Sequence, residues 1–572
     1  MQSADYIVIV LYIVGIVGAG MMFGRRMKNS AEMFSAGGQS PWWVSGLSGF
    51  MTMFSAGTFV VWGGIAYRYG FVAVAINMCY GFAALLVGWY LAGVWRKFGV
   101  ASASEFLQLR FGRTVVQFYT WFQGMIAVFM VGGPIYALSK VVCALMPLPD
   151  GHILADPATG MLSVTLTSIA LCLIVVLIAF SGGLWAVLVT DVLQFVILVV
   201  SVVFVVPLIL MEVGGWSAFI AQVPEGFTQP VAQDFTWWFL LGWVVIHFFK
   251  IGGEWGFVQR FTCVPTATDA KKSAYLFGVM YLVSPLFWML PPLVFRVINP
   301  NVDFEQAYIL ACQTVLPAGM MGLMIAAMAS ATASVATSQL NVFAGAFTTE
   351  VYQRLFKPGA SERQLVMMGR VFTVILGGLV LSGALLIPRY GYTSFVLDLA
   401  ILLTGPLVLP TIWGLFSKKI GEGTVWCTTL LGFVTAVVVK FGLSHGGFMV
   451  DWAGFVSLSE VVVAHQRLAD LVAGIVVPLI LLLGIELVST REHEGWRRVS
   501  ISRDSFHETA AAAPSTLPTK MVAATLAAIA VMMIALAIWQ TSERSTLLLF
   551  AIILIAIAAV VFAAIRRGES SG

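Results

Sequence analysis

The stretch Trp237–Arg260, WWFLLGWVVIHFFKIGGEWGFVQR, is apolar over a length that can cross a bilayer, yet it contains His247, Lys250 and Glu254. An ionisable side chain at membrane depth is costly, so it usually faces a cavity or a partner and marks the path of a solute, an ion or a proton. The Gly252-Gly253 pair just before Glu254 favours an unwound helix with exposed backbone groups. The stretch therefore predicts a broken membrane helix that carries a binding site.

The composition predicts an all-α polytopic membrane protein. Of the 572 residues, 60% are hydrophobic and only 10% are charged, with a mean hydropathy of +0.95. A soluble domain carries about 25% charged residues. On the scale of about 20 apolar residues per helix, the chain divides into about 15 transmembrane helices. They are predicted at residues 4–22, 42–66, 70–94, 115–138, 162–180, 184–211, 236–258, 273–295, 315–350, 367–388, 392–416, 423–440, 467–489, 521–540 and 545–565.

The distribution of basic residues predicts the orientation. If the N-terminus lies outside, most of the 31 lysines and arginines, Arg260 among them, fall in inner loops. We therefore expect a multi-pass protein of the cell (inner) membrane, with the N-terminus outside and the C-terminus cytoplasmic. The first apolar stretch has neither a preceding basic region nor a cleavage site, so it is expected to be a retained helix.

Several function classes lack their sequence signals. The six cysteines are scattered without a CxxC pair, so neither a metal cluster nor a disulfide framework is indicated. No P-loop, HExxH or GxSxG motif in a soluble context is present, so the chain is not expected to be an enzyme. A nucleic-acid partner is not expected either, whereas the lipid bilayer is.

The spans suggest an internal symmetry. The second span reads FMTMFSAGTFVVWGG at 50–64, with Ser55, Ala56, Gly57 and Thr58 at its middle, and the seventh contains the opening stretch. Sets of five helices beginning at these two spans would run in opposite directions. Transporters with inverted repeats of this kind bind their substrate at the midplane, where the opening helices are broken.

This symmetry divides the chain into six segments. They are an N-terminal extra helix with the first cytoplasmic loop (1–41), the first repeat with core helices 1–5 (42–211), the second repeat with core helices 6–10 (212–416), peripheral helices (417–490), a partly disordered cytoplasmic linker (491–520) and two additional C-terminal helices (521–572).

His247, Lys250 and Glu254 are the strongest candidates for binding. Their spacing of i, i+3 and i+7 places them along one face of an unbroken helix. One interpretation is that Lys250 and Glu254 only neutralise each other in a packing contact. Because such a pair is costly in a membrane, we favour a role in lining a cavity. The other five histidines, expected to be solvated in loops or at span ends, are His152, His445, His465, His493 and His507.

Other candidates concern a cation. Asp191 lies in SGGLWAVLVTDVLQF (181–195). It is predicted either to be a protonated packing residue or to lie next to the ligands of a bound cation. Asp398 is another candidate for a buried carboxylate. The ninth span contains AAMASATASVATSQLNVF at 326–343. Such a run is more often a close-packing face, although its hydroxyls and carbonyls are the oxygen donors that a small cation needs.

The segment Ser181–Val187 followed by Thr190–Gln194 resembles the signature of the sodium/solute symporters. The resemblance covers about residues 4 to 490 and is supported by Pro41-Trp42-Trp43, Ser55-Ala56 with Gly64–Gly70, Ser104–Leu107 with Arg110-Phe111-Gly112, Gln259-Arg260, Leu340-Asn341, Glu350–Tyr352 and Gly414–Phe416. It implies a leucine-transporter-type fold of two inverted five-helix repeats and alternating access.

The resemblance also implies a sodium site between core helices 1 and 8. Its ligands would be the carbonyls of Met51, Phe54 and Ala331 and the hydroxyl of Ser334, with Asp191 nearby. The family commonly has a second hydroxyl residue directly after the first, and this chain has Val335. The lost oxygen would have to be replaced by one from Thr332, Thr337, Ser338 or Asp191.

His247 falls where sugar-carrying members of this family have an Asn, Lys250 where they have a gating Tyr, and Thr58 at another solute-contacting position. The sugar site is thus not reproduced, and Lys250 would suit a solute that carries a carboxylate. We expect a symporter of a small polar organic solute, with Thr58, His247, Lys250 and Glu254 at the solute. Sodium would be a coupling ion and not a prosthetic group. The alternatives are a proton-coupled carrier that uses Lys250, His247 and Glu254, and a transporter-like solute sensor.

Overall fold

The fold is a bundle of helices. The structure, a computed structural model, describes residues 2–24, 30–149, 151–387, 404–452, 454–506, 517–539 and 544–570. Within these ranges every regular element is a helix, apart from three isolated bridges of extended backbone. Ten of the described helices are long and apolar enough to span a membrane, or eleven if one bent pair counts as a span. The predicted all-α membrane architecture is confirmed.

The helices follow the predicted spans in order. The first half contains α1 (Ser3–Gly24), α2 (Ser30–Ser35), α3 (Trp42–Met53), η2 (Thr58–Trp62), α4 (Gly63–Tyr69), α5 (Val72–Tyr90), α6 (Ala92–Lys97), α7 (Ala103–Phe111), α8 (Arg113–Ala144) and α9 (Val164–Glu212). It is followed by α10 (Trp216–Gln222), α11 (Trp237–Gly253), α12 (Trp255–Thr262), α13 (Ala267–Val283), α14 (Pro285–Trp288), α15 (Leu290–Ile298), α16 (Ala307–Val315), α17 (Met320–Ala346), η3 (Phe347–Phe356) and α18 (Glu362–Leu386). The last third contains a helix at 404–413, then α20 (Glu422–Val437), η5 (Val438–Gly442), α21 (Val456–Ala464), α22 (Gln466–Leu471), η6 (Val472–Val476), α23 (Val477–Val488), α24 (Glu494–Ser505), α25 (Leu517–Trp539) and α26 (Arg544–Ser570).

One long element contains two predicted spans. α9 is divided at Gly183, whose φ of 52° and ψ of −172° are not helical. The positive φ explains why this position carries glycine. The first part of the predicted span 392–416, residues 392–403, lies outside the described residues, so the total of about 15 helices stays a prediction.

Both predicted helix breaks are present. α3 and the η2–α4 segment are bent by 60° at residues 54–57, where Phe54 is extended. The second break follows α11 at Glu254, whose φ of −68° and ψ of 135° are extended. Here the sequence-based reason was wrong, because Gly252 and Gly253 themselves stay helical.

Close packing is what requires the two glycines. A Cβ on Gly252 would lie 2.3 Å from Leu91 Cδ1, and one on Gly253 would lie 2.4 Å from Val408 Cγ1. The two glycines therefore let the end of α11 pack closely against Leu91 and Val408 just before the helix break at Glu254.

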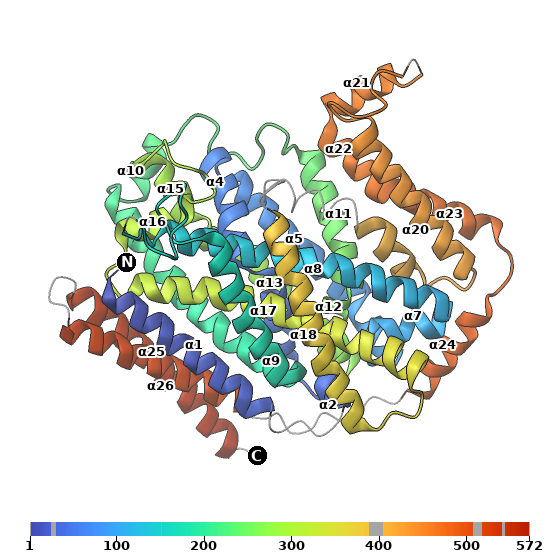
Figure 1. The fold of residues 1–572 in the computed structure, drawn as a ribbon, viewed down its shortest axis with the longest axis horizontal. Helices are drawn as coiled ribbons and strands as arrows, with labels where there is room; N and C mark the ends of the chain where they lie inside the picture. The colour runs from blue at the N-terminus through green and yellow to red at the C-terminus, as the bar shows by residue number, and fades with distance from the viewer. Residues whose placement is uncertain are drawn as a thin grey trace.

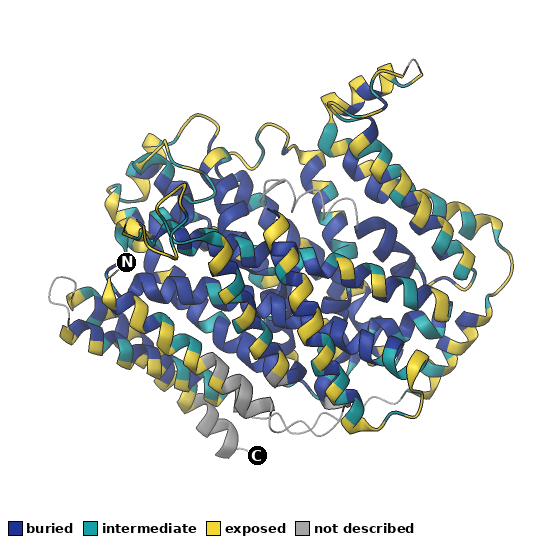
Figure 2. Ribbon diagram, in the orientation of Figure 1, coloured by how far each residue is buried: buried dark blue, intermediate teal, exposed yellow. Residues whose placement is uncertain are grey.

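α17 forms the centre of the bundle and is buried along nearly its whole length. It packs against α9, α8 and α1. Figure 2 shows buried residues at the centre and exposed residues along outer helices such as α20. The Asp5 carboxylate of α1 accepts hydrogen bonds from the amides of Gly319 (2.7 Å) and Gly322 (2.9 Å), so the first helix caps the start of α17.

The 491–520 segment is more ordered than expected. Its first part forms α24, which buries Trp496 and Val499 and packs against α7. The Ser502 hydroxyl also donates to the carbonyl of Phe98 at 3.0 Å. Residues 494–505 of this segment therefore form a docked helix, and the partial disorder predicted for the linker stays a prediction. Residues 507–516, including His507, lie outside the described residues.

The two additional C-terminal helices pack against the core through α9. α25 and α26 form an antiparallel pair (Figure 1), and α25 contacts α9. The rings of Phe204 on α9 and Phe550 on α26 are stacked with centroids 3.5 Å apart.

Candidate functional site

The two helix breaks open onto one central cavity of about 110 Å³. Thr58 reaches it from η2, His247 and Lys250 from α11, and Glu254 from the second break. The structure thus brings together all four residues that the sequence predicted for the solute. Aromatic rings line the same cavity, among them Trp62, Tyr80 and Trp243, and the last two contact His247.

His247 is buried and held in a fixed orientation. Its ring lies 4.2 Å from the Tyr80 ring and 4.6 Å from the Trp243 ring, measured between centroids. Its Nδ1 is 2.9 Å from the Trp243 carbonyl oxygen. Because a carbonyl only accepts, Nδ1 carries a hydrogen, and in the neutral ring Nε2 is then a hydrogen-bond acceptor.

Lys250 and Glu254 form a loose ion pair at the cavity wall. Lys250 Nζ lies 3.9 Å from Glu254 Oε2, and the side chains are 12% and 22% exposed. The Gln339 amide donates to Glu254 Oε1 at 2.9 Å. Gln339 was missed by the sequence analysis, although an amide in the small-residue stretch of α17 was a visible signal.

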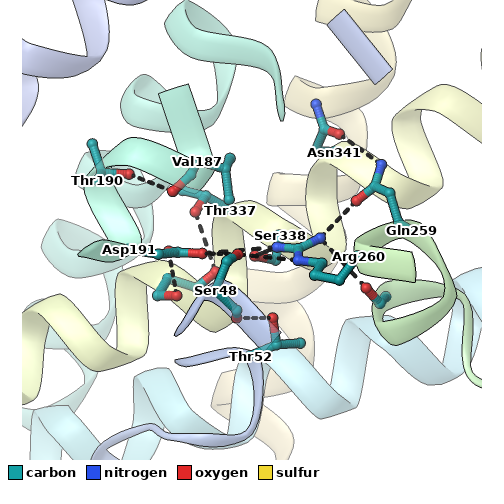
Figure 3. A network of polar contacts seen from close by, with 12 residues as sticks. Ser48, Thr52, Val187, Thr190, Asp191, Gln259, Arg260, Thr337, Ser338 and Asn341 are labelled. Carbon is teal, nitrogen blue, oxygen red and sulfur yellow. Dashed lines mark hydrogen bonds and ion pairs between the residues drawn. The ribbon is translucent and has the colours of Figure 1, made fainter. Parts of the chain in front are cut away.

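Asp191, the predicted cation residue of α9, lies in a second polar cluster (Figure 3). Its two carboxylate oxygens accept hydrogen bonds from Ser48 and Ser334, both at 2.5 Å. Asp191 is fully buried. The structure thus joins two predicted sodium residues, Asp191 and Ser334, and adds Ser48 of α3, which the sequence analysis missed.

Arg260 completes this cluster from α12. Its Nη2 lies 3.8 Å from Asp191 Oδ2 and donates to Ser338 at 2.6 Å, while Nε donates to Ser48 at 3.1 Å. Figure 3 shows its guanidinium pointing toward Ser48 and Asp191. The charge distribution placed Arg260 in a loop, but its side chain is only 1% exposed. Ser48, Asp191 and Ser338 lie far from Arg260 in the sequence, so these partners could not be inferred from local pattern.

The remaining predicted sodium residues lie at the first break and on the facing part of α17. The Phe54 amide donates to the Met51 carbonyl at 3.1 Å, while Phe54 is extended. The Ala56 amide donates to the Thr332 hydroxyl at 3.1 Å, which ties the break to α17 one residue after Ala331.

The hydroxyl residues expected to compensate for Val335 have different hydrogen-bond partners. Thr332 and Thr337 donate to backbone carbonyls of their own helix, at 3.0 and 2.8 Å, and Ser338 accepts from Arg260. Val335 itself lines the central cavity. Asp398 lies outside the described residues.

One of the histidines expected to be solvated has a structural role. His493 is half-buried, and its Nδ1 accepts from the Gly495 amide at 3.3 Å at the start of α24. The His493 ring also packs closely against Gly421, because a Cβ added to Gly421 would lie 2.3 Å from two atoms of the ring.

Comparisons with known proteins agree on one family. Residues 33–432 match the description "Sodium:solute symporter family". The sodium/sialic acid symporter NanT of Aliivibrio fischeri is 27% identical over 465 residues, covering 76% of this chain and 86% of that protein. Sodium/glucose cotransporter 4 of Danio rerio is 24% identical over 490 residues, covering 77% of this chain and 72% of the relative.

Solved structures show the same fold. The substrate-bound outward-open state of a Na+-coupled sialic acid symporter, described as revealing a novel Na+-site, superposes with a TM-score of 0.68 at 20% identity and covers 84% of this chain and 98% of its own. Mhp1, a nucleobase-cation-symport-1 transporter with bound bromovinylhydantoin, has a TM-score of 0.54 at 13% identity and covers 83% of this chain and 99% of its own.

Proposed function

Because this chain belongs to the sodium:solute symporter family, we propose that its central cavity binds a small polar organic solute with a carboxylate group and that Lys250 is the counter-charge. The protein is a multi-pass membrane transporter that couples the movement of a small solute to sodium. It is not an enzyme. The proposal concerns what the chain moves and which residues hold it.

The observation that carries the proposal is the position of Lys250. It lies on the wall of a buried cavity between two helix breaks, and its ion pair with Glu254 is long at 3.9 Å. An ammonium donates three hydrogen bonds, and a pair at this distance is weaker than a direct charge-assisted hydrogen bond. A solute carboxylate would supply the closer partner, with Thr58 and His247 at its polar groups.

We assign the sodium site to the carbonyls of Met51, Phe54 and Ala331 and the hydroxyl of Ser334, with Asp191 behind it. Ser334 donates its hydroxyl hydrogen to Asp191. Its oxygen lone pairs therefore remain available to a cation, and the carboxylate increases their negative charge. This arrangement supports sodium binding although Val335 supplies no oxygen.

The orientation and the repeats complete the proposal. The basic-residue distribution supports an N-terminus outside, a C-terminus in the cytoplasm and a location in the inner membrane. The breaks at Phe54 and Glu254 support the two inverted repeats at 42–211 and 212–416.

The first test is uptake by proteoliposomes that contain Lys250→Met. Removing the ammonium should abolish sodium-driven uptake of carboxylate solutes. The variant should still fold and show a cooperative thermal transition, at a lower temperature than the wild type because Glu254 loses its cation. Lys357→Met removes an exposed lysine and is the matched control. Uptake by Lys250→Met at the wild-type rate would contradict the proposal.

The same assay separates the coupling ions. Uptake should collapse when choline replaces sodium, as family membership implies. Uptake that persists in choline under a proton gradient would instead support a proton-coupled carrier. Sodium-dependent binding without net flux would support a solute sensor.

A further inference from the structure

A second chamber adjoins the central cavity. It has a volume of about 60 Å³ and shares four residues with the cavity, namely Met130, Lys250, Glu254 and Gln339. The rest of its wall is mainly apolar, with Ala127 from α8, Phe343 from α17 and Leu407 and Val408 from the helix at 404–413. The Lys250–Glu254 pair therefore lies at the junction between a cavity with polar groups and an apolar chamber.

The junction contains one positive and one negative group. Lys250 and Glu254 are largely buried, 3.9 Å apart, and have no net charge together. Glu254 also accepts from the neutral amide of Gln339. In the described residues no second cation lies within ion-pair distance of Glu254.

A solute with only a carboxylate fits this junction poorly. By engaging Lys250 it would draw away the one cation that faces Glu254, and an uncompensated buried charge is strongly unfavourable. A solute that carries an ammonium as well would give Glu254 a new cation in place of Lys250. The loose pair would become two close pairs, and the net charge of the site with solute would remain zero.

From this geometry, and resting on the proposed function, we propose that the solute is a zwitterionic amino acid with an apolar side chain, bound with its carboxylate at Lys250, its ammonium at Glu254 and its side chain in the second chamber. The neutral His247 ring, with Nε2 as an acceptor, provides a further partner for the ammonium on the cavity side. The apolar wall of the second chamber favours the side chain by the hydrophobic effect.

The charge requirement is tested with three probes of one carbon skeleton. They are L-leucine, 4-methylpentanoate, which lacks the ammonium, and 3-methylbutylamine, which lacks the carboxylate. Thermal stabilisation of the purified wild-type protein is measured in sodium and in choline. Leucine should bind in sodium, and each analogue should bind at least about tenfold more weakly because one buried charge stays unpaired.

The Glu254→Gln variant tests the role of the carboxylate. It should lose the preference for the ammonium, so that 4-methylpentanoate binds as tightly as leucine. A merely structural role for Glu254 would weaken both ligands equally. That result would overturn the assignment.

The chamber is tested with Val408→Phe, which fills it. The ratio of leucine to alanine affinity should fall at least about tenfold, since only the larger side chain needs the space. Val434→Phe, at an exposed position of α20, should leave the ratio unchanged. An unchanged ratio in Val408→Phe would overturn the placement of the side chain.

The outcomes separate the two proposals. If 4-methylpentanoate binds the wild type as tightly as leucine in sodium, the zwitterion is excluded and a carboxylate solute stands. If neither ligand binds in sodium and Lys250→Met leaves uptake of carboxylate solutes unchanged, both proposals fail.

Discussion

Ser334 is the residue on which the proposed sodium site depends most directly. Its hydroxyl connects the site to Asp191, which Ser48 and Arg260 hold on the other side. An ordinary helix serine would use its hydroxyl on its own backbone, as Thr332 and Thr337 do. The hydroxyl of Ser334, the proposed ligand, differs from those of Thr332 and Thr337 in that it donates to a carboxylate of another helix.

Substituting Ser334 should therefore weaken sodium binding. Ser334→Ala removes one of about five oxygens, and we expect the sodium concentration for half-maximal uptake to rise about tenfold. Thr337→Ala removes a hydroxyl that donates to its own helix and should change this value little. Equal effects of the two substitutions on sodium dependence would argue against the assignment of Ser334.

Residue types indicated which residues line the cavity better than they indicated which residues support them. His247 and Lys250 were recognisable because ionisable groups in apolar spans are costly, whereas Thr58 was identified through the family resemblance. Ser48 and Gln339 were missed because serine and glutamine occur in packed membrane helices for many reasons. Their roles depend on Asp191 and Glu254, which are 143 and 85 residues away in the sequence.

At the scale of elements, the end of α11 depends on close packing. Gly253→Ala would place a methyl group against Val408 and Ile412, and we expect a loss of about 1–3 kcal/mol in the free energy of unfolding. Gly378→Ala on α18 meets no atom within 4 Å and should stabilise the protein by about 0.5–1 kcal/mol. Thermal unfolding of both variants checks the sign, and a stabilised Gly253→Ala would contradict the packing argument.

The docking of α24 should depend on pH through His493. Burial lowers the pKa of His493 below its ordinary value of about 6.5, and Arg110 and Arg498 lower it further, while Glu494 and Glu422 oppose this. The neutral ring caps α24 through Nδ1. Because the pKa is lower in the docked state, docking is fully stabilised above about pH 6.5 and is weakened as the pH falls through the lower value.

Hydrogen exchange of residues 494–505 measures this effect. Exchange should accelerate between pH 7 and pH 5, after correction for the intrinsic rate, in the wild type. In His493→Asn the side chain still caps the helix but does not titrate, so protection should vary less with pH. The same pH dependence in both proteins would exclude His493 as its cause.

At the scale of the whole molecule, the order of spans was predictable and the docking of segments was not. Hydropathy locates helices because the bilayer requires a fixed apolar length. α24 was missed because only two apolar side chains, those of Trp496 and Val499, lie on its buried face, and its average composition is that of a linker. Its partners, α7 and the Phe98 carbonyl just after α6, become neighbours only in the folded bundle.

Coupling between solute and sodium is a property of the whole bundle. The proposed sodium site lies between the broken first span and α17, which the Ala56–Thr332 hydrogen bond joins, and the proposed solute cavity lies between the same break and α11. A ligand that holds two of these helices together reduces the cost of binding the other ligand. Thermodynamic linkage requires the two effects to be equal.

We therefore expect sodium to raise leucine affinity by the same factor by which leucine raises sodium affinity, about 5–150-fold, as calorimetric titrations of each ligand with and without the other would show. Lys250→Met should still be stabilised by sodium, since its substitution leaves the oxygen ligands in place, but the effect of leucine on sodium affinity should vanish. If Lys250→Met also lost stabilisation by sodium, the two sites could not be separate. Lys250 would then have to act on the sodium ligands directly and not through the solute.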